Sequence, residues 1–313
     1  MRNKLLLSVF ILTYNHEKFI REALDSVLNQ VTSFDFEIII GDDASTDKTP
    51  DILKEYQTKY SDRIKLFLRK KNLGGKGANN LLDLVKRCTG KYVIALEGDD
   101  YWIDKYKLER QVNFLERHPE YIGVAHKCVV VDEISHPNGE QYPECIDKIY
   151  TIKHLASNIM PGQFTTLMYR NIYCDSKVDY TLLEQGLLPA DRLICFILLS
   201  YGSIYCMNEV ASAYRHITSS GTSFSANVNW KYEEARKWNK SIVQYSKRIG
   251  NKESLKYAQL MLMKTIIGSR KRDNIRWKMI LHDLFEEKIP LLRYFQYASQ
   301  IVRRVVLKKV VWA

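Results

Sequence analysis

Several familiar features are missing from this 313-residue chain, and each absence excludes a class of protein. Its six cysteines include no C-x-x-C pair, which argues against a zinc site or a disulfide framework and fits a reducing compartment. No apolar run reaches 18 residues, so the sequence predicts no membrane-spanning helix. Neither a P-loop nor a G-x-G-x-x-G turn is present, which argues against a kinase, an ATPase and a nicotinamide enzyme.

The composition is that of a folded protein. Apolar residues make up 46% of the chain and aromatic residues 12%, which is enough for one large core or two modest ones. There is no internal repeat and no low-complexity segment. A disordered, fibrous or disulfide-stapled protein is therefore not expected.

The net charge of +11 suggests a nucleic-acid ligand until the charge is located in the chain. Residues 228–313 hold 20 basic and 7 acidic side chains, so this stretch alone carries +13, and residues 1–227 carry −2. We therefore divide the chain into a near-neutral domain, 1–227, and a basic, mainly helical region, 228–313.

The first residues resemble a signal peptide, because Arg2 and Lys4 precede an apolar run over residues 5–12. No small-residue cleavage site follows, and Thr13-Tyr14-Asn15 leads directly into a helical pattern. We interpret the run as a buried first strand.

Residues 1–100 alternate between strand-like and helix-like patterns. The expected strands are residues 6–12, 36–40, 64–68 and 92–96, and the expected helices are residues 19–28, about 49–60 and about 79–87. Strands that are apolar on both faces and alternate with helices predict a mostly parallel sheet covered on both sides. Beyond them we expect short strands at 129–131, 164–169 and 211–214 and a helix at 192–201.

Polar clusters follow three of the predicted strands, at their carboxyl ends. They are Thr13-Tyr14-Asn15, Asp42-Asp43 and Glu97-Gly98-Asp99-Asp100. Ligands of such sheets bind beyond the carboxyl ends of the strands, so these segments predict one shared site.

Adjacent carboxylates such as Asp99 and Asp100 repel each other unless a cation or hydrogen-bond donors neutralise them. Their hard oxygen atoms suit Mg²⁺ or Mn²⁺, and the alternative is a solvated turn. Asp43 could accept hydrogen bonds from a base or a ribose, or the segment could only cap the next helix through Thr46 or Asp47. The glycine-rich turn at 74–77 could bring backbone amides close to a phosphate.

Two later residues have ordinary alternatives when taken alone. Asp191 precedes an apolar helix, where a capping role is the usual interpretation. His216 lies in a polar loop, where a surface histidine is more common than a ligand. Their meaning depends on the rest of the pattern.

The ordered set of segments resembles glycosyltransferase family 2, whose members are inverting, nucleotide-sugar-dependent enzymes with the GT-A fold. The segments are residues 8–15 (SVFILTYN), 41–47 (GDDASTD), 72–74 (NLG) and 97–100 (EGDD). The resemblance is strong over residues 5–130 and continues more loosely through Asp191 and Tyr214-Arg215-His216. It implies an α/β GT-A domain at 1–227, with a nucleotide-sugar half at about 1–130 and an acceptor half at about 131–227.

The resemblance also implies roles for individual residues. The nucleotide-sugar site would comprise the residues Thr13, Tyr14, Asn15, Asp43, Asn72, Gly74, Glu97 and Asp99. Asp99 and Asp100 match the DxD-type motif and would hold a divalent cation, Mn²⁺ or Mg²⁺, together with His216. Glu97 stands where a first Asp is common. Asp191 matches the catalytic base, which would take the proton of the acceptor hydroxyl while the sugar is displaced with inversion.

Two other classes of protein compete with this interpretation. A nucleic-acid-binding protein would use Arg270-Lys271-Arg272 with Arg276, Trp277 and Lys278, but no recognition module is present. A nucleotidyltransferase also places acids beside a nucleotide, but it would release pyrophosphate instead of a nucleoside diphosphate.

The end of the chain carries its own prediction. Apolar residues recur at helical spacing between basic residues 303, 304, 308 and 309, namely Ile301, Val302, Val305, Val306 and Val310, with Trp312 beyond. This pattern predicts either a helix packed on the domain or a helix in an anionic membrane interface, and we favour the membrane. We accordingly expect a cytoplasmic, peripheral membrane enzyme that uses a UDP- or dTDP-sugar. Its expected acceptor is lipid-linked, such as a surface polysaccharide of the O-antigen or capsule kind, and no nucleic acid is expected as a partner.

Overall fold

The computed structural model describes residues 5–145, 148–175, 177–217, 232–272, 277–286 and 288–299. The chain forms two compact units, Met1–Asn227 and Val228–Ala313. Each unit is described by itself.

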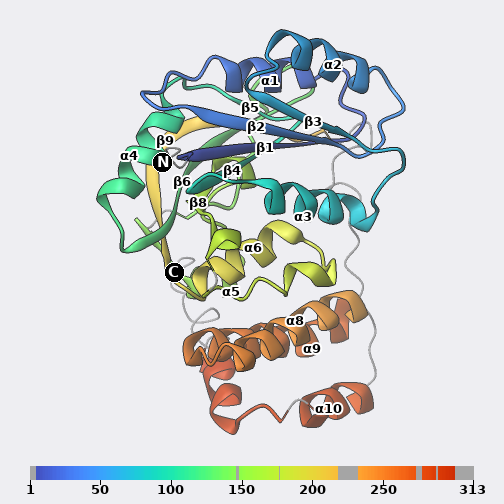
Figure 1. Cartoon of the computed structure of the whole chain (residues 1–313). Coiled ribbons are helices and arrows are strands. Elements are labelled where there is room, and N and C mark those ends of the chain that lie inside the picture. Colours follow the sequence, from blue (N-terminus) through green and yellow to red (C-terminus); the bar gives the residue numbers. More distant parts are fainter. Residues whose placement is uncertain are drawn as a thin grey trace. The chain divides into compact units, whose positions relative to one another are not determined.

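The first part of unit 1 alternates strands and helices, as the sequence predicts (Figure 1). The elements are β1 (Leu7–Thr13), α1 (Ile20–Leu28), β2 (Phe36–Asp42), α2 (Thr49–Lys59), β3 (Ile64–Leu68), α3 (Ala78–Arg87) and β4 (Tyr92–Glu97). The apolar run near the N-terminus is the buried strand β1, which lies between β2 and β4. Proline at the start of α2 needs no backbone hydrogen bond there, which suits the first turn of a helix.

The rest of unit 1 is less regular. Its elements are β5 (Tyr101–Trp102), α4 (Lys107–Arg117), β6 (Tyr121–Val131), β7 (Ile149–Tyr150), α5 (Ile152–Ala156), β8 (Met168–Arg170), α6 (Ala190–Leu199) and β9 (Ser203–Arg215), with short 3-10 helices at η1 (Gly75–Gly77), η2 (Phe164–Thr166), η3 (Ile172–Cys174) and η4 (Leu183–Gln185). The strand expected at 164–169 is wrong over its first half. The Gln163 side chain accepts a hydrogen bond from the Thr165 amide and thereby begins the 3-10 turn η2.

One mixed sheet joins these strands in the order β3-β2-β1-β4-β8-β6-β9-β5, and β7 pairs with β9. The strands β1 to β4 are parallel to one another, and β8 is antiparallel to both β4 and β6. The expected mostly parallel core is confirmed, and antiparallel strands extend it on the side of β4.

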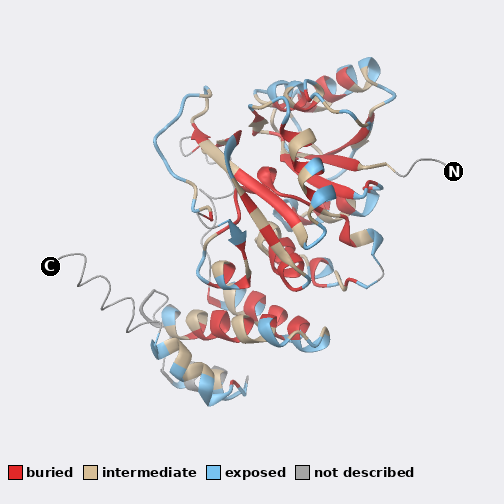
Figure 2. Cartoon of the chain, turned by 90° about the vertical axis from the view of Figure 1, so that its left-hand side faces the viewer, coloured by how far each residue is buried: buried red, intermediate tan, exposed pale blue. Residues whose placement is uncertain are grey.

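Alternate residues of the central strands face opposite layers of helices. Val9, Ile38 and Ile94 share one buried cluster with α1, α2 and α4. Figure 1 shows α1 and α2 on one side of the sheet and α3 and α6 on the other, and Figure 2 shows that the buried residues concentrate between these layers. Gly41 allows α3 to cross β2 closely, because a Cβ atom there would lie 2.6 Å from Asn80 Oδ1.

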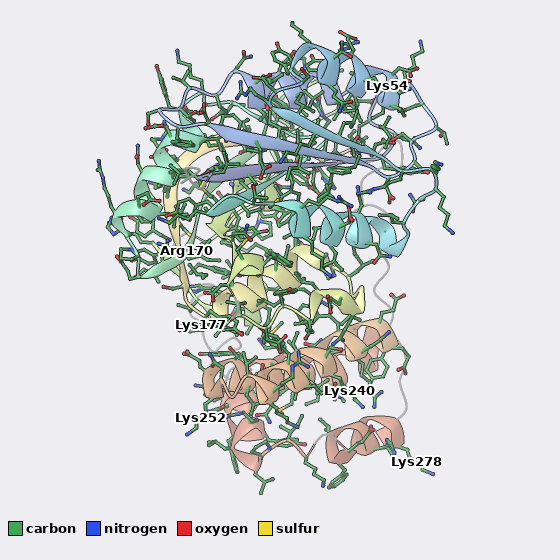
Figure 3. The ribbon with its side chains drawn as sticks, in the orientation of Figure 1. Lys54, Arg170, Lys177, Lys240, Lys252 and Lys278 are labelled. Carbon is green, nitrogen blue, oxygen red and sulfur yellow. The ribbon has the colours of Figure 1, made fainter. Side chains whose placement is uncertain are left out.

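Unit 2 is helical and basic. It contains α8 (Tyr232–Arg248), α9 (Lys252–Arg272), α10 (Trp277–Glu286) and a further helix over residues 291–299. The buried side chains of α8 and α9 include Trp238, Ile242 and Leu262, and Lys252 and Lys278 extend away from their helices (Figure 3). Among the described residues, no helix is long and apolar enough to cross a bilayer. The predicted helix with apolar residues 301–310 lies outside the described residues.

Candidate active site

The register of the parallel strands places the three predicted polar clusters at one edge of the sheet. Thr13 at the end of β1 pairs with Asp42 at the end of β2, and the neighbouring Leu12 pairs with Glu97 at the end of β4. The segments that follow these strands therefore begin side by side, at the edge where ligands of parallel sheets bind.

At the carboxyl end of β2, the two acids Asp42 and Asp43 accept hydrogen bonds from neighbouring loops of the protein. Asp42 accepts hydrogen bonds from the amide (3.0 Å) and the hydroxyl of Ser45. Asp43 Oδ1 accepts one from the Leu73 amide at 2.7 Å, and the Asn72 side-chain amide donates to the Asp43 carbonyl at 3.0 Å. These two hydrogen bonds join Asp43 to the loop after β3. A nucleotide site formed by both segments would need them to lie side by side.

Three further residues of the predicted nucleotide site lie in the loops around Asp43. We call this region, at the carboxyl end of β2, the β2 corner. Asn15 has a positive φ of 55°, and its side-chain oxygen accepts a hydrogen bond from the Thr46 amide at 2.8 Å. Gly74 has a φ of 78°, and its amide donates to Asn72 Oδ1 at 2.8 Å. The ring of Tyr14 is 47% exposed, so it is available for stacking.

The β4 side carries the larger cluster of acids. Asp100 is 1% exposed, and its two oxygens accept hydrogen bonds from the Arg215 amide (2.8 Å) and from Gln163 Nε2 (3.0 Å). The same nitrogen of Gln163 donates to Glu97 Oε2 at 2.8 Å. The side chain of Asp99 is 22% exposed, which makes it the acid of the adjacent pair that solvent can reach.

The electrostatics of these acids show a deficit of positive charge. Burial and the charges of Asp99 and Asp191 raise the pKa of Glu97 to about 8. Burial and the charges of Asp99 and Glu97 also raise the pKa of Asp100 well above its usual range. Because like charges at one place disfavour ionisation, a positively charged ligand would relieve the repulsion.

Two orphaned polar atoms lie next to Asp99. Thr13 Oγ1 and His16 Nδ1 are buried and have no hydrogen-bond partner among the described residues. His16 Nε2 lies 4.0 Å from Asp99 Oδ2. A Cβ atom on Gly98 would lie 2.7 Å from His16 Nδ1 and 2.9 Å from Thr13 Oγ1, so only glycine fits between them.

Asp191 reaches the same site from a distant part of the chain. It lies in the first turn of α6, where burial raises the pKa of its carboxyl. Its charge contributes to the raised pKa of Glu97 and to that of Tyr142, so these three side chains are electrostatic neighbours. Pro189 is the N-cap residue of α6, so the usual capping role does not account for Asp191.

Arg215 and His216 of the Tyr214-Arg215-His216 segment at the end of β9 make different contacts. Arg215 is 1% exposed, and its side chain donates to the Asp99 carbonyl at 2.8 Å, to Glu22 at 2.6 Å and to the carbonyls of residues 132 and 133. His216 Nδ1 lies 2.6 Å from Glu140 Oε2, and its amide donates to the Val131 carbonyl. Arg215 is therefore hydrogen-bonded to the backbone and to a side chain of the acid cluster. His216 instead pairs with Glu140, which lies in a different loop.

These residues suit a divalent cation that is shared with a ligand. Among the described residues, no three His, Cys, Asp or Glu side chains form a ready-made metal site. Asp99 is nevertheless solvent-accessible beside two acids with raised pKa values, and Mg²⁺ and Mn²⁺ often bind through one or two carboxylates plus substrate phosphates.

The sequence analysis did not single out three contributors to the site, His16, Gln163 and Arg215. His16 directly follows the polar end of β1, a position that could have marked it. Gln163 is a lone glutamine in an apolar stretch, and Arg215 acts across 115 positions of sequence, so neither has a local signal.

Comparisons with known proteins show the family of the chain. The model of the Glycosyl transferase family 2 domain matches residues 8–172, more than half of the chain. An uncharacterized protein of Mycobacterium tuberculosis is 34% identical over 67% of this chain, which spans 58% of that protein's length. The minor teichoic acid biosynthesis protein GgaB of Bacillus subtilis is 23% identical over 96% of this chain, but the match covers 32% of GgaB.

Solved structures share the fold. Staphylococcus aureus TarS 1–349 in complex with UDP-GlcNAc superposes with a TM-score of 0.61 at 20% identity, covering 94% of this chain and 79% of that one. The mannosyltransferase PcManGT of Pyrobaculum calidifontis, in complex with GDP-Man and Mn²⁺, gives 0.50 at 16% identity, covering 99% and 88%. These likenesses establish the α/β GT-A-like fold with its C-terminal helical region. The chain belongs to glycosyl transferase family 2.

Proposed function

We propose that this chain transfers a sugar from a nucleoside-diphosphate sugar to a hydroxyl group of a cell-surface polymer, with inversion at the anomeric carbon. The observation that carries the proposal is that the charge of Asp191, at the start of α6, helps to raise the pKa of Glu97 at the end of β4. A glycosyl transfer needs a base for the acceptor and a binding site for the leaving diphosphate within the length of one sugar. Asp191 at the start of α6 and Asp99 after β4 are the groups that would meet these two needs.

The nucleoside part of the donor would bind at the β2 corner. The Asp43 carboxylate is held by the Leu73 amide and keeps acceptor capacity for a base or ribose hydroxyl. Tyr14 is exposed and offers a ring for stacking on the base, and Thr13 Oγ1 is a buried hydroxyl that has no partner within the described part of the chain. Asn15, Asn72 and Gly74 hold the two loops around this corner.

The diphosphate part would bind at the β4 corner, where Asp99 is accessible. A bound divalent cation, Mn²⁺ or Mg²⁺, would stabilise the negative charge that develops on the leaving group. Asp99 is the residue that would hold it, with Asp100 fixed behind by two donors. His216 would join only by leaving Glu140. The Mn²⁺ in the PcManGT complex supports this assignment.

Asp191 would act as the catalytic base. Burial raises the pKa of its carboxyl, and a carboxylate with a raised pKa is a stronger base near neutral pH. It would take the proton of the acceptor hydroxyl while the hydroxyl oxygen bonds to the anomeric carbon. The bond from that carbon to the diphosphate oxygen breaks in the same displacement, and the diphosphate leaves with the bonding electrons.

The names of the relatives support a UDP-sugar donor and a wall-polymer acceptor. TarS was solved with UDP-GlcNAc, and GgaB is named for teichoic acid biosynthesis. A dTDP-sugar donor and an O-antigen or capsule acceptor are the nearest alternatives.

A donor screen tests the proposal. The chain is incubated with UDP-, dTDP- and GDP-sugars, with and without Mn²⁺, and the nucleoside diphosphate and pyrophosphate that it releases are measured separately. We expect slow hydrolysis of one donor with release of nucleoside diphosphate only. Pyrophosphate release would instead identify a nucleotidyltransferase.

We further propose that unit 2 contacts the cytoplasmic membrane surface, through what we call the apolar face. It consists of Phe285, Leu291, Leu292 and Phe295, which are 79%, 76%, 59% and 73% exposed. Leu291, Leu292 and Phe295 share the helix over residues 291–299 with Arg293, which donates to Gln259 of α9 from the opposite side of that helix, and Phe285 lies near the end of α10. Exposed apolar residues mark contact sites, and the charge of +13 over residues 228–313 favours anionic lipid.

Co-sedimentation with phosphatidylglycerol vesicles tests this contact. Replacing the four residues of the apolar face by serine should abolish binding at moderate salt. The matched control replaces Ile134 and Val210, exposed apolar residues of unit 1, by serine and should bind like the wild type. Equal binding by both variants would exclude the apolar face as the membrane contact.

A further inference from the structure

Gln163 has a side-chain amide whose hydrogen-bonding capacity is fully used. It is 3% exposed and immediately precedes η2. Its nitrogen donates to Glu97 Oε2 at 2.8 Å and to Asp100 Oδ2 at 3.0 Å. Its oxygen accepts from the Thr165 amide and from the Thr165 hydroxyl, both at 2.6 Å. An amide has two donors and two acceptor lone pairs, so none of them remains unpaired.

This pattern permits only one orientation of the amide. A flipped Gln163 would direct its own N–H groups at the Thr165 backbone amide, which can only donate a hydrogen bond. The chemistry of the neighbours therefore fixes which atom faces the acids. Thr165 is itself held in place, because its carbonyl accepts a hydrogen bond from the indole of Trp102 at 3.2 Å.

The amide nitrogen of Gln163 bridges the two acids. Glu97 and Asp100 contact the same nitrogen atom, although like charges repel. Glu97 is one methylene longer than an aspartate, and its carboxylate lies against Gln163. Asp100 is buried, whereas Glu97 is partly exposed like Asp99, and Gln163 occupies the side of Glu97 that faces Asp100.

We propose that Gln163 is a positioning residue of the donor site, which fixes Glu97 and Asp100 so that Asp99 meets the cation and diphosphate in one geometry. The inference rests on the proposed function. Gln163 acts through the two acids and touches no reacting atom. Groups that orient metal-binding carboxylates in this way typically change metal affinity by about 10–100-fold when they are removed.

The test replaces Gln163 by methionine, which keeps the length of the side chain and removes its polar atoms. Free Mn²⁺ is titrated against the full chain by electron paramagnetic resonance, with and without UDP. We expect Gln163→Met to weaken Mn²⁺ binding by about 10–100-fold. The Mn²⁺ concentration for half-maximal turnover should rise by the same factor, while kcat at saturating Mn²⁺ changes less.

Gln111 provides a matched control for loss of a buried amide. It is 1% exposed, and its nitrogen donates to the carbonyls of Val124 and Thr166, away from the acids. Gln111→Met should lower the melting temperature at least as much as Gln163→Met and leave Mn²⁺ affinity unchanged. Should Gln111→Met fail to fold, Gln30→Met replaces it, because the Gln30 amide donates to the Asp104 carbonyl outside the site.

The outcomes separate the inference from the proposed function. Tight Mn²⁺ binding by the wild type that Gln163→Met leaves unchanged overturns the positioning role alone. Equal weakening by Gln163→Met and the control also overturns it, because a loss of packing would then explain both. Absence of Mn²⁺ binding by the wild type, with or without UDP, overturns the proposed cation site and the inference with it. A Gln163→Met chain that does not fold is replaced by Gln163→Asn, which keeps the amide but shortens its reach and should give a smaller weakening.

Discussion

The tripeptide Gly-Asp-Asp occurs twice at the sheet edge, at residues 41–43 across the end of β2 and at residues 98–100 directly after β4, and the two copies have different surroundings. In the first copy both acids are buried and accept hydrogen bonds from nearby loops. In the second copy Asp100 is buried and Asp99 is accessible, with Glu97 beside them. The same three residues thus acquire different roles from the segments that face them.

The largest effect should come from an acid outside both copies. Asp191→Asn keeps the shape of the side chain but removes the proposed base, so turnover should fall by about 10²–10⁴-fold. Donor binding, measured by calorimetry with UDP-GlcNAc and Mn²⁺, should stay within about twofold. Turnover like that of the wild type would remove Asp191 from the mechanism and leave the two Gly-Asp-Asp copies to account for catalysis.

Asp99→Asn tests the accessible acid of the second copy. Loss of the charge beside the diphosphate should lower turnover by about 10²–10³-fold. It should also abolish Mn²⁺ binding measured by electron paramagnetic resonance. The matched variant Asp42→Asn, in the first copy, should bind Mn²⁺ like the wild type. If both variants lost Mn²⁺ binding equally, the proposal that only the second Gly-Asp-Asp copy binds the cation would be wrong.

The pH dependence of stability should belong to the second copy. The Glu97 carboxyl has a pKa of about 8 in the folded chain against 4.5 as its ordinary value, so the folded state holds a proton that the unfolded state has released. Stability is therefore highest below about pH 4.5 for this group and falls as pH rises to about 8. Without metal, the free energy of unfolding should drop by about 3 kcal/mol between pH 5 and pH 8.

Denaturation across this pH range measures the effect. Glu97→Gln should flatten the curve, and Glu55→Gln, which alters an exposed acid paired with Arg21, should not. If the free energy of unfolding of Glu97→Gln fell with pH as steeply as that of the wild type, Glu97 would not carry the raised pKa that we assign to it.

Asp43→Asn should weaken binding of the nucleotide-sugar donor without changing the affinity for the cation. The amide oxygen can still accept from Leu73, but the negative charge facing the nucleoside is lost. The KM for the donor should rise by about tenfold, which corresponds to the loss of one hydrogen bond to a charged group. The Mn²⁺ requirement, read from a metal titration of turnover, should not change, and a changed requirement would join Asp43 to the cation site.

The smallest effect concerns Ser45, which donates to Asp42 through its amide and its hydroxyl. Ser45→Ala removes the hydroxyl and should lower the free energy of unfolding by about 1 kcal/mol. Ser33→Ala, which removes an exposed hydroxyl beside Glu109, should stay within about 0.5 kcal/mol. Urea denaturation compares the two, and an equal loss would mean that Asp42 does not depend on this donor.

Sequence patterns predicted the part of the fold that local rules control. The strands and helices of residues 7–87 follow from apolar periodicity and from proline and glycine positions, and their polar ends followed from the strand limits. The pattern missed α4, and it found only the end of the long strand β9, whose outer residues are exposed around Glu209. Periodicity fails there because three consecutive residues, 208–210, are exposed next to a register shift between β6 and β9.

The candidate site divides in the same way. Acids at strand ends were predictable, because a carboxylate after a buried apolar run is unusual. Their donors were not predictable, because Gln163 and Arg215 belong to segments whose place beside β4 depends on antiparallel strands and long loops. Acids can be found from local sequence, whereas the groups that stabilise them depend on tertiary structure.

The Arg215 contacts also have a consequence for synthesis on the ribosome. The Arg215 backbone amide bonds to Asp100, and its guanidinium bonds to the Asp99 carbonyl and to Glu22, 193 positions earlier in the chain. Translation is directional, so β1 to β4 emerge well before these donors exist. Until β9 is made, the nascent chain carries the acids after β4 without their partners from Arg215. The candidate site is therefore among the last parts of unit 1 to mature, although most of its own residues are made first.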